Sequence, residues 1–138
     1  MFRRILLAYD GSDASTTAAD LAIDLARRYG ARLTVVSVAR PPEFGDEVET
    51  EAVIENSRAY HETLLDAVRT RVKASGIDAT FMVEVGHPTE QIIAAAERAE
   101  TDLIVLGHRG KTLFQRLRLG SVSKQVVQYA DCPVLVVR

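Results

Sequence analysis

Residues 3–13 have the sequence Arg-Arg-Ile-Leu-Leu-Ala-Tyr-Asp-Gly-Ser-Asp. The unbroken apolar run inside this stretch predicts a β-strand over Arg3–Tyr9 that is buried on both faces, as in a parallel sheet. Asp10-Gly11-Ser12-Asp13 ends the strand and supplies residues that cap helix N-termini. Apolar residues then recur at helical spacing as far as Gly30: Ala18, Leu21, Ala22, Leu25, Ala26 and Tyr29. A buried strand followed at once by an amphipathic helix is typical of an α/β protein.

The same alternation continues along the chain. Further apolar runs predict strands at Leu33–Val38, Ala79–Val85, Leu103–Leu106 and Val134–Val137. Helices are expected over about 52–75, after Pro88, and from about Ser121 to Tyr129. The apolar face of the long helix is expected to contain Val53, Leu64, Leu65, Ala67, Val68 and Val72. The acidic residues 43–52 are expected to form a mobile surface segment. Together these elements predict one domain over residues 1–138, an open, doubly wound parallel sheet with helices on both faces.

Composition limits the classes of partner. Seventeen basic and nineteen acidic residues give a formal net charge of −2, which offers no overall attraction to nucleic acid or to an anionic membrane. No apolar run approaches the roughly 20 residues of a membrane span. Residues 1–20 contain no apolar stretch typical of a signal peptide, so a cytoplasmic location is expected. The single cysteine, Cys132, excludes an intrachain disulfide and is expected to be a small buried apolar residue.

The unusual residues follow the predicted strands at their carboxyl ends, where ligands bind in open α/β sheets. Asp10 ends the first strand, Gly107-His108-Arg109-Gly110 ends the fourth, and Gly120-Ser121-Val122 opens the helix that follows. Glycines let a backbone approach an anion, and a helix N-terminus presents unpaired N–H groups. The basic residues Lys111, Arg116 and Arg118 lie between. The segment Gly107–Ser121 is therefore predicted to hold the phosphates of a nucleotide.

Two common nucleotide signatures are absent. Gly110-Lys111-Thr112 looks like the end of a P-loop, but Val105 occupies the position where that motif needs its first glycine. The first strand is followed by Asp10-Gly11-Ser12-Asp13 and not by the G-x-G-x-x-G fingerprint of dinucleotide-binding proteins.

The spacing that is present, Gly107-x2-Gly110-x9-Gly120-Ser121, resembles the phosphate-binding motif of the universal stress protein family, in its ATP-binding branch. The resemblance extends over the whole chain. It includes the opening Ile-Leu-Leu-Ala-Tyr-Asp-Gly-Ser, the turn Gly86-His87-Pro88 and the ending Ala130–Val137.

The resemblance implies an adenine nucleotide alpha hydrolase-like fold, with five strands in the order 3-2-1-4-5 and four helices. It places Asp10 near the adenine and ribose, with Ala8 and Tyr9 also among the nucleotide-binding residues. The backbone of Val38 would contact the adenine, although many relatives carry His where this chain has Ser37. Leu106 and Gly107 would line the base and ribose. The phosphates would be surrounded by Arg109, Gly110, Gly120, Ser121 and Val122.

The resemblance also implies ligand and partner. ATP is the expected ligand, and AMP, ADP or cyclic AMP could use part of the same site. Mg²⁺ could bridge the phosphates with few protein ligands. A homodimer is expected through antiparallel pairing of the last strand, Val134–Val137, because an apolar strand at a sheet edge invites a partner. The chain would then act as a dimeric regulatory module of the stress response.

Two alternatives remain open. One is a dimeric interaction protein of the same family that works without nucleotide. The other is an enzyme of nucleotide chemistry, at most a slow ATPase, but no nucleophile, base and orienting residue can be assembled from the sequence. The three histidines have no metal-ligand spacing. His61 is expected on the surface and His87 in a structural turn, while His108 could approach a phosphate.

Overall fold

The apolar run near the start of the chain forms the central strand of a parallel sheet. A computed structural model describes residues 1–41, 47–108 and 120–138. In it β1 (Arg4–Ala8) pairs in parallel with β2 (Arg32–Ala39) on one side and with β4 (Leu103–Gly107) on the other. The outer strands are β3 (Ala79–Val85) beside β2 and β5 (Val134–Val137) beside β4. The predicted order β3-β2-β1-β4-β5 is confirmed.

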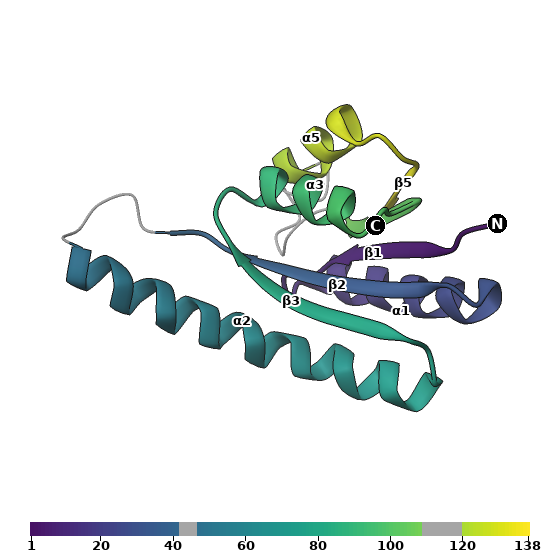
Figure 1. The fold of residues 1–138 in the computed structure, drawn as a ribbon, viewed down its shortest axis with the longest axis horizontal. Helices are drawn as coiled ribbons and strands as arrows, with labels where there is room; N and C mark the ends of the chain where they lie inside the picture. The colour runs from purple at the N-terminus through teal and green to yellow at the C-terminus, as the bar shows by residue number, and fades with distance from the viewer. Residues whose placement is uncertain (42–46, 109–119) are drawn as a thin grey trace.

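Helices cover both faces of this sheet, as predicted (Figure 1). One face packs against α1 (Asp13–Tyr29) and α2 (Glu47–Ser75), and the other against α3 (Pro88–Arg98) and α5 (Ser121–Tyr129). Alternate residues of β1 serve the two faces: Ile5 and Leu7 join the first core cluster, and Leu6 joins the second. Side chains alternate across a strand, so a strand between two helical layers must be apolar at every position. Of the helices described, none is long and apolar enough to cross a membrane.

The long helix departs from the sequence prediction. α2 begins at Glu47, so the second half of the segment predicted to be mobile is helical, while residues 43–46 lie outside the described residues. Val53 and Ala67, predicted to face the core, are exposed. From residue 51 onward the buried apolar residues of α2 are Leu65, Val68 and Val72, all in its C-terminal half. The helix is longer than its contact with the sheet, so periodicity alone overestimated its apolar face.

Two of the apolar residues that recur at helical spacing in α1, Leu21 and Tyr29, are exposed. Alanines, not large side chains, are the buried residues of α1: Ala18, Ala19, Ala22 and Ala26. Small side chains let the helix axis lie close to the sheet, which pushes the larger residues to the margins of the contact. Tyr29 instead packs edge-on against Phe2, with ring centroids 5.5 Å apart.

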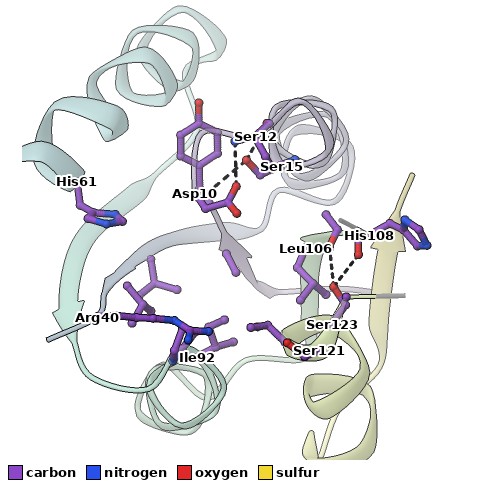
Figure 2. Close-up of a pocket in the computed structure, with 18 of the residues that line it drawn as sticks. Asp10, Ser12, Ser15, Arg40, His61, Ile92, Leu106, His108, Ser121 and Ser123 are labelled. Carbon is purple, nitrogen blue, oxygen red and sulfur yellow. Dashed lines mark hydrogen bonds between the residues drawn. The ribbon is translucent and has the colours of Figure 1, made fainter. Parts of the chain in front are cut away.

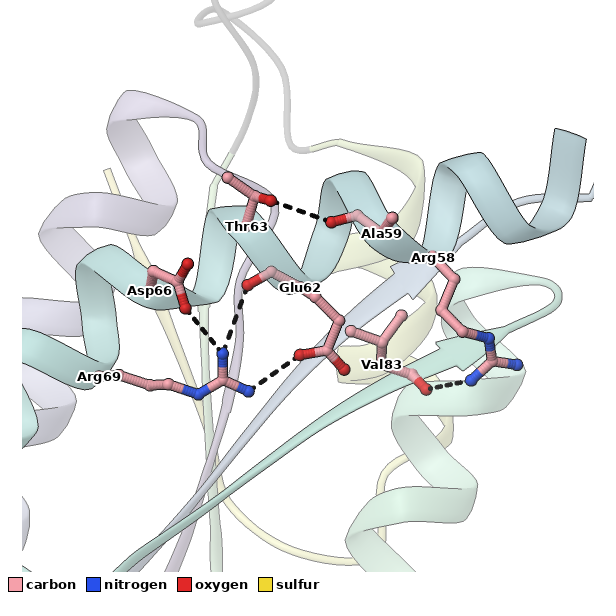
Figure 3. Close-up of polar contacts among 7 residues, drawn as sticks. All are labelled: Arg58, Ala59, Glu62, Thr63, Asp66, Arg69 and Val83. Carbon is pink, nitrogen blue, oxygen red and sulfur yellow. Dashed lines mark hydrogen bonds and ion pairs between the residues drawn. The ribbon is translucent and has the colours of Figure 1, made fainter.

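Side chains of α2 cover the outer edge of β3 (Figure 3). Nη1 of Arg58 donates a hydrogen bond to the carbonyl oxygen of Val83 at 3.4 Å. The guanidinium of Arg69 donates hydrogen bonds to the carboxylates of Glu62 and Asp66 on the same helix. It also lies 5.1 Å from the ring centroid of Phe81 on β3. Charged side chains over an edge strand oppose pairing with another chain. This end of the sheet is therefore a poor place for association.

Candidate functional site

A cavity of about 580 Å³ opens at the carboxyl ends of β1 and β4 (Figure 2). These two strands are adjacent, with Ala8 paired to Leu106, yet their following helices cover opposite faces of the sheet. The two helices therefore begin on opposite faces of the sheet and leave a crevice at the carboxyl ends of β1 and β4. The volume lies within the range of small-molecule sites.

Every predicted site residue that the structure describes lines this cavity: Ala8, Tyr9, Asp10, Val38, Leu106, Gly107, Gly120, Ser121 and Val122. Arg109 and Gly110 lie outside the described residues, as do Lys111, Arg116 and Arg118. The tertiary structure thus brings together residues from four separate parts of the sequence. Their role in binding stays a prediction.

The turn after β1 gives Asp10 and Ser12 different roles. Ser12 is the N-cap of α1, and its Oγ accepts a hydrogen bond from the backbone N–H of Ser15 at 3.2 Å. Asp10 lies two residues earlier, and its Oδ1 accepts from the backbone N–H of Ser12 at 2.9 Å. Gly11 between them has a φ of +82°, which favours glycine. Because Ser12 caps the helix, Asp10 is not needed for that purpose, and its exposed carboxylate lies at the cavity.

Gly107, at the end of β4, is required by packing. A Cβ atom built there would lie 2.8 Å from both the carbonyl carbon of Ala14 and the backbone nitrogen of Ser15. The first turn of α1 therefore lies directly against the end of β4. The sequence suggested that this glycine admits a phosphate, but the described contacts give it a structural reason that needs no ligand.

The start of α5 is tied to the end of β4 by a short set of hydrogen bonds. The hydroxyl of Ser123 donates to the carbonyl oxygens of Gly107 at 2.8 Å and His108 at 3.2 Å. The backbone N–H of Gly120 donates to His108 O at 3.1 Å. These bonds fix the direction in which the first turn of α5 faces the cavity.

That first turn presents backbone donors to the cavity. The N-cap, Gly120, has no side chain to satisfy the N–H groups that follow, and Ser121, Val122 and Ser123 all line the cavity. The first N–H groups of a helix have no intrahelical acceptor, and they carry the positive end of the helix dipole. Such an arrangement can hold an anion, above all a phosphate.

The opposite side of the cavity contains residues that sequence reasoning missed. Arg40 follows β2 and extends toward Ile92 of α3, and His61 reaches the cavity from α2 (Figure 2). Arg40 could have been found, because it stands just after a strand that ends at the same sheet edge. His61 could not, since nothing in the sequence indicates which turn of a long helix crosses that edge.

His61 was predicted to be on the surface, and this was wrong. The side chain is half-buried, and its Nδ1 lies 2.6 Å from Oγ of the buried Ser37 on β2. Burial lowers the pKa of His61 below its ordinary value, and the negative charge of Asp10 opposes this effect only in part. The imidazole is therefore kept mainly neutral at neutral pH.

The other singled-out residues lie away from the centre of the cavity. His87 is exposed and is the N-cap of α3. His108 is buried at the rim, and its ring is directed away from Asp10 (Figure 2). Cys132, which the sequence predicted to be buried, is only half-buried, and its partial burial raises the pKa of its thiol. Within residues 1–41, 47–108 and 120–138, no group of three His, Cys, Asp or Glu side chains could hold a metal ion.

The chain as a whole is similar to known proteins of one family. The model of the universal stress protein family matches residues 1–138. A curated universal stress protein of Thermus aquaticus is 40% identical over 139 residues, and the alignment covers 100% of both chains. The structure of universal stress protein UspA from Lactobacillus plantarum is 28% identical with a TM-score of 0.88, covering 99% of this chain and 97% of that one. A universal stress protein crystallised in complex with cAMP is also 28% identical, with a TM-score of 0.75 and the same coverage.

Proposed function

Because this chain belongs to the universal stress protein family, we propose that its cavity binds an adenine nucleotide, with ATP as the preferred ligand. The observation that carries the proposal is the N-terminus of α5, which has no side-chain cap and opens into the cavity beside the other predicted site residues. The related protein in complex with cAMP supports the same class of ligand.

In the proposed complex, the phosphates of the nucleotide lie at the first turn of α5. The backbone N–H groups of Ser121 and Val122 and the hydroxyl of Ser121 would donate to phosphate oxygens. Arg109 and Gly110, which the family motif places at the phosphates, are part of the same proposal. Mg²⁺ would be held chiefly by the phosphates, since the described residues offer no cluster of ligands for it.

The proposed nucleoside end lies between Val38 and Leu106. Both residues line the cavity and belong to the apolar cluster on the α3 and α5 face of the sheet, and apolar surroundings suit the faces of a purine ring. The carboxylate of Asp10 has the acceptor oxygens that ribose hydroxyl groups require. A nucleotide with its base beside Val38 and Leu106 and its phosphates at α5 would span the cavity.

The arrangement of the cavity residues favours binding a nucleotide over hydrolysing it. Near the first turn of α5, the described cavity residues include hydroxyls and backbone donors but no carboxylate or imidazole directed at the same place (Figure 2). Backbone donors can stabilise charge on a phosphate, but rapid hydrolysis also needs a group that positions the attacking water. We therefore propose a regulatory ligand in a stress-response module, with slow hydrolysis at most. The cytoplasmic location expected from the sequence stays a prediction.

Titration calorimetry and thermal melting test the proposal on the purified protein. ATP at about a hundred times its Kd is expected to stabilise the folded state by about 2.7 kcal/mol, because it binds only that state. Matched titrations with ADP, AMP and cyclic AMP would identify the preferred nucleotide, and GTP is the control for the base. No binding heat and no change in melting temperature with any adenine nucleotide would leave the nucleotide-independent interaction protein as the better description.

We also propose that the protein dimerises through β5, the edge strand opposite β3. Ile104 N–H donates to Pro133 O, and His108 N–H donates to Val137 O. Alternate residues of a parallel strand face the neighbouring strand, so the N–H and C=O groups of Val134 and Val136 point away from β4. Among the described residues no hydrogen bond satisfies these groups. On β3, by contrast, the carbonyl oxygen of Val83 accepts a hydrogen bond from Arg58. The exposed, apolar Leu135 completes an edge suited to pairing.

The substitution Val136→Pro is expected to convert the dimer to a monomer in sedimentation velocity. Proline removes an N–H that points outward, so it breaks the proposed pairing and leaves the hydrogen bonds between β5 and β4 in place. Val136→Ala is the control, because it reduces the side chain but keeps the N–H, and it should remain dimeric. A dimer that persists in a folded Val136→Pro variant would place the interface elsewhere.

A further inference from the structure

Among the residues of α2 from 51 onward, whose side chains the structure describes, His61 is the one titratable residue that lines the cavity. It is held there by a short hydrogen bond, 2.6 Å, between its Nδ1 and the hydroxyl of Ser37. Ser37 is 1% exposed and lies in the middle of the β2 pairing with β3, so it provides a rigid support.

The bond to Ser37 leaves a single ring nitrogen for other partners. A neutral imidazole has one donor and one acceptor nitrogen, and a hydroxyl can satisfy either. With Nδ1 engaged, Nε2 is the atom of His61 that can contact a molecule in the cavity. The ring is thus oriented by one neighbour and keeps one hydrogen-bonding group for a ligand, as oriented histidines commonly do.

The position of His61 indicates which part of the ligand it contacts. His61 approaches from α2 on one side of the cavity, and Ser121 at the start of α5 lies on the other (Figure 2). Phosphates at α5 would leave the base and sugar on the side of Val38 and His61. Building on the nucleotide-binding function proposed above, we propose that His61, positioned by Ser37, contacts the nucleoside part of the nucleotide through Nε2 and must be neutral to do so.

Protonation of His61 opposes binding for a solvation reason. A ligand seated over the half-buried ring removes the remaining water from it, and the loss of water disfavours the imidazolium more than the neutral ring. The pKa of His61 is already lowered by burial in the free protein, and ligand binding would lower it further. Affinity should then be constant above the pKa of the free protein and fall as the pH drops through it.

Other charged groups around His61 do not account for such a profile. They are Asp10 after β1 and Arg40 after β2, which line the same cavity, and Arg58 and Glu62 of α2, which bond Val83 and Arg69. Glu84 of β3 and Asp20 of α1 are paired elsewhere, with Arg98 and Arg71. His61→Gln leaves all of these groups in place, so a pH dependence that this variant loses belongs to His61. Asp10 attracts a proton to His61, which would oppose the proposed direction, but burial has the larger effect on the pKa of the free ring.

Calorimetric titration with ATP between about pH 5 and 8 tests the inference. The Kd of the wild-type protein is expected to rise about fivefold toward the acid end, because a pKa that falls by about one on binding gives a full tenfold change only well below both pKa values. For His61→Gln, which cannot titrate, we expect an about fivefold weaker Kd at pH 8, as for a lost hydrogen bond. The ratio of the two Kd values should approach one as the pH falls. Taking this ratio cancels the titration of the phosphates of ATP.

Two further variants separate positioning from titration. His87→Gln replaces an exposed histidine outside the cavity and should retain the wild-type profile. Ser37→Ala should weaken binding at every pH but keep a pH dependence, because His61 still titrates. Melting temperatures verify that each variant is folded. A ratio of wild-type to His61→Gln Kd that does not change with pH would overturn the inference alone, whereas absence of ATP binding to the wild-type protein would overturn the proposed function as well.

Discussion

Gly120→Asp is expected to weaken ATP binding by about a hundredfold or more, with the fold intact. An aspartate at the N-cap of α5 can accept hydrogen bonds from the N–H groups of the first turn, which are the donors assigned to the phosphates. Its charge would also face the incoming phosphates, and like charges placed together cost several kcal/mol, or about a hundredfold in Kd. Gly120 has φ −61° and ψ 154°, an extended conformation that any residue can adopt.

Gly120→Asn is the matched control for charge. Asparagine caps a helix about as well as aspartate and has nearly the same shape, but it is neutral. It should compete for the same N–H groups and weaken ATP binding clearly less than aspartate does. Calorimetry gives both Kd values, and melting curves should show both variants at least as stable as the wild-type protein. Wild-type affinity in Gly120→Asp would move the phosphates away from α5.

Gly107→Ala is expected to destabilise the protein by about 3 kcal/mol, as severe overpacking does. The new Cβ atom would lie 2.8 Å from two backbone atoms at the start of α1, Ala14 C and Ser15 N. Backbone atoms cannot rotate away as a side chain can, so β4 and α1 would have to separate. Chemical denaturation measures this loss directly, and the melting temperature should fall by about 10 °C.

Gly76→Ala separates this clash from the general cost of replacing a glycine. Gly76 follows α2 with a φ of +73°, and nothing lies within 4 Å of a Cβ atom built there. Its replacement costs only backbone strain, about 1 kcal/mol. If Gly107→Ala were no more destabilising than Gly76→Ala, the close approach of α1 to β4 would be wrong.

Two glycines of the sequence motif are expected to have different roles. Gly107 and Gly120 belong to the same spaced pattern, yet their surroundings differ. Gly107 fills a contact between a strand and a helix, whereas Gly120 leaves a helix N-terminus without a side-chain cap. We therefore expect Gly107 to act on the fold and Gly120 on the ligand.

The sheet could be predicted from the sequence because its signals are local. Continuous apolar runs predicted all five strands, with the bounds of β3 and β5 correct and the others within one residue. The order of the strands came from the family resemblance and not from the runs themselves. The extent of α2 and its exposed Val53 and Ala67 could not be predicted, since a helix pattern does not specify how much sheet lies beneath it.

The sequence by itself also indicated which residues at the carboxyl ends of the strands line the cavity, because turn residues and glycines that follow apolar runs can be recognised from the local sequence. Only the tertiary structure decided that Arg40 and His61 join them, that Ser37 orients His61, and that Ser12 rather than Asp10 caps α1. These roles depend on how helices are placed over the sheet. That placement is set by side-chain volumes at contacts between segments far apart in the chain, which no local pattern records.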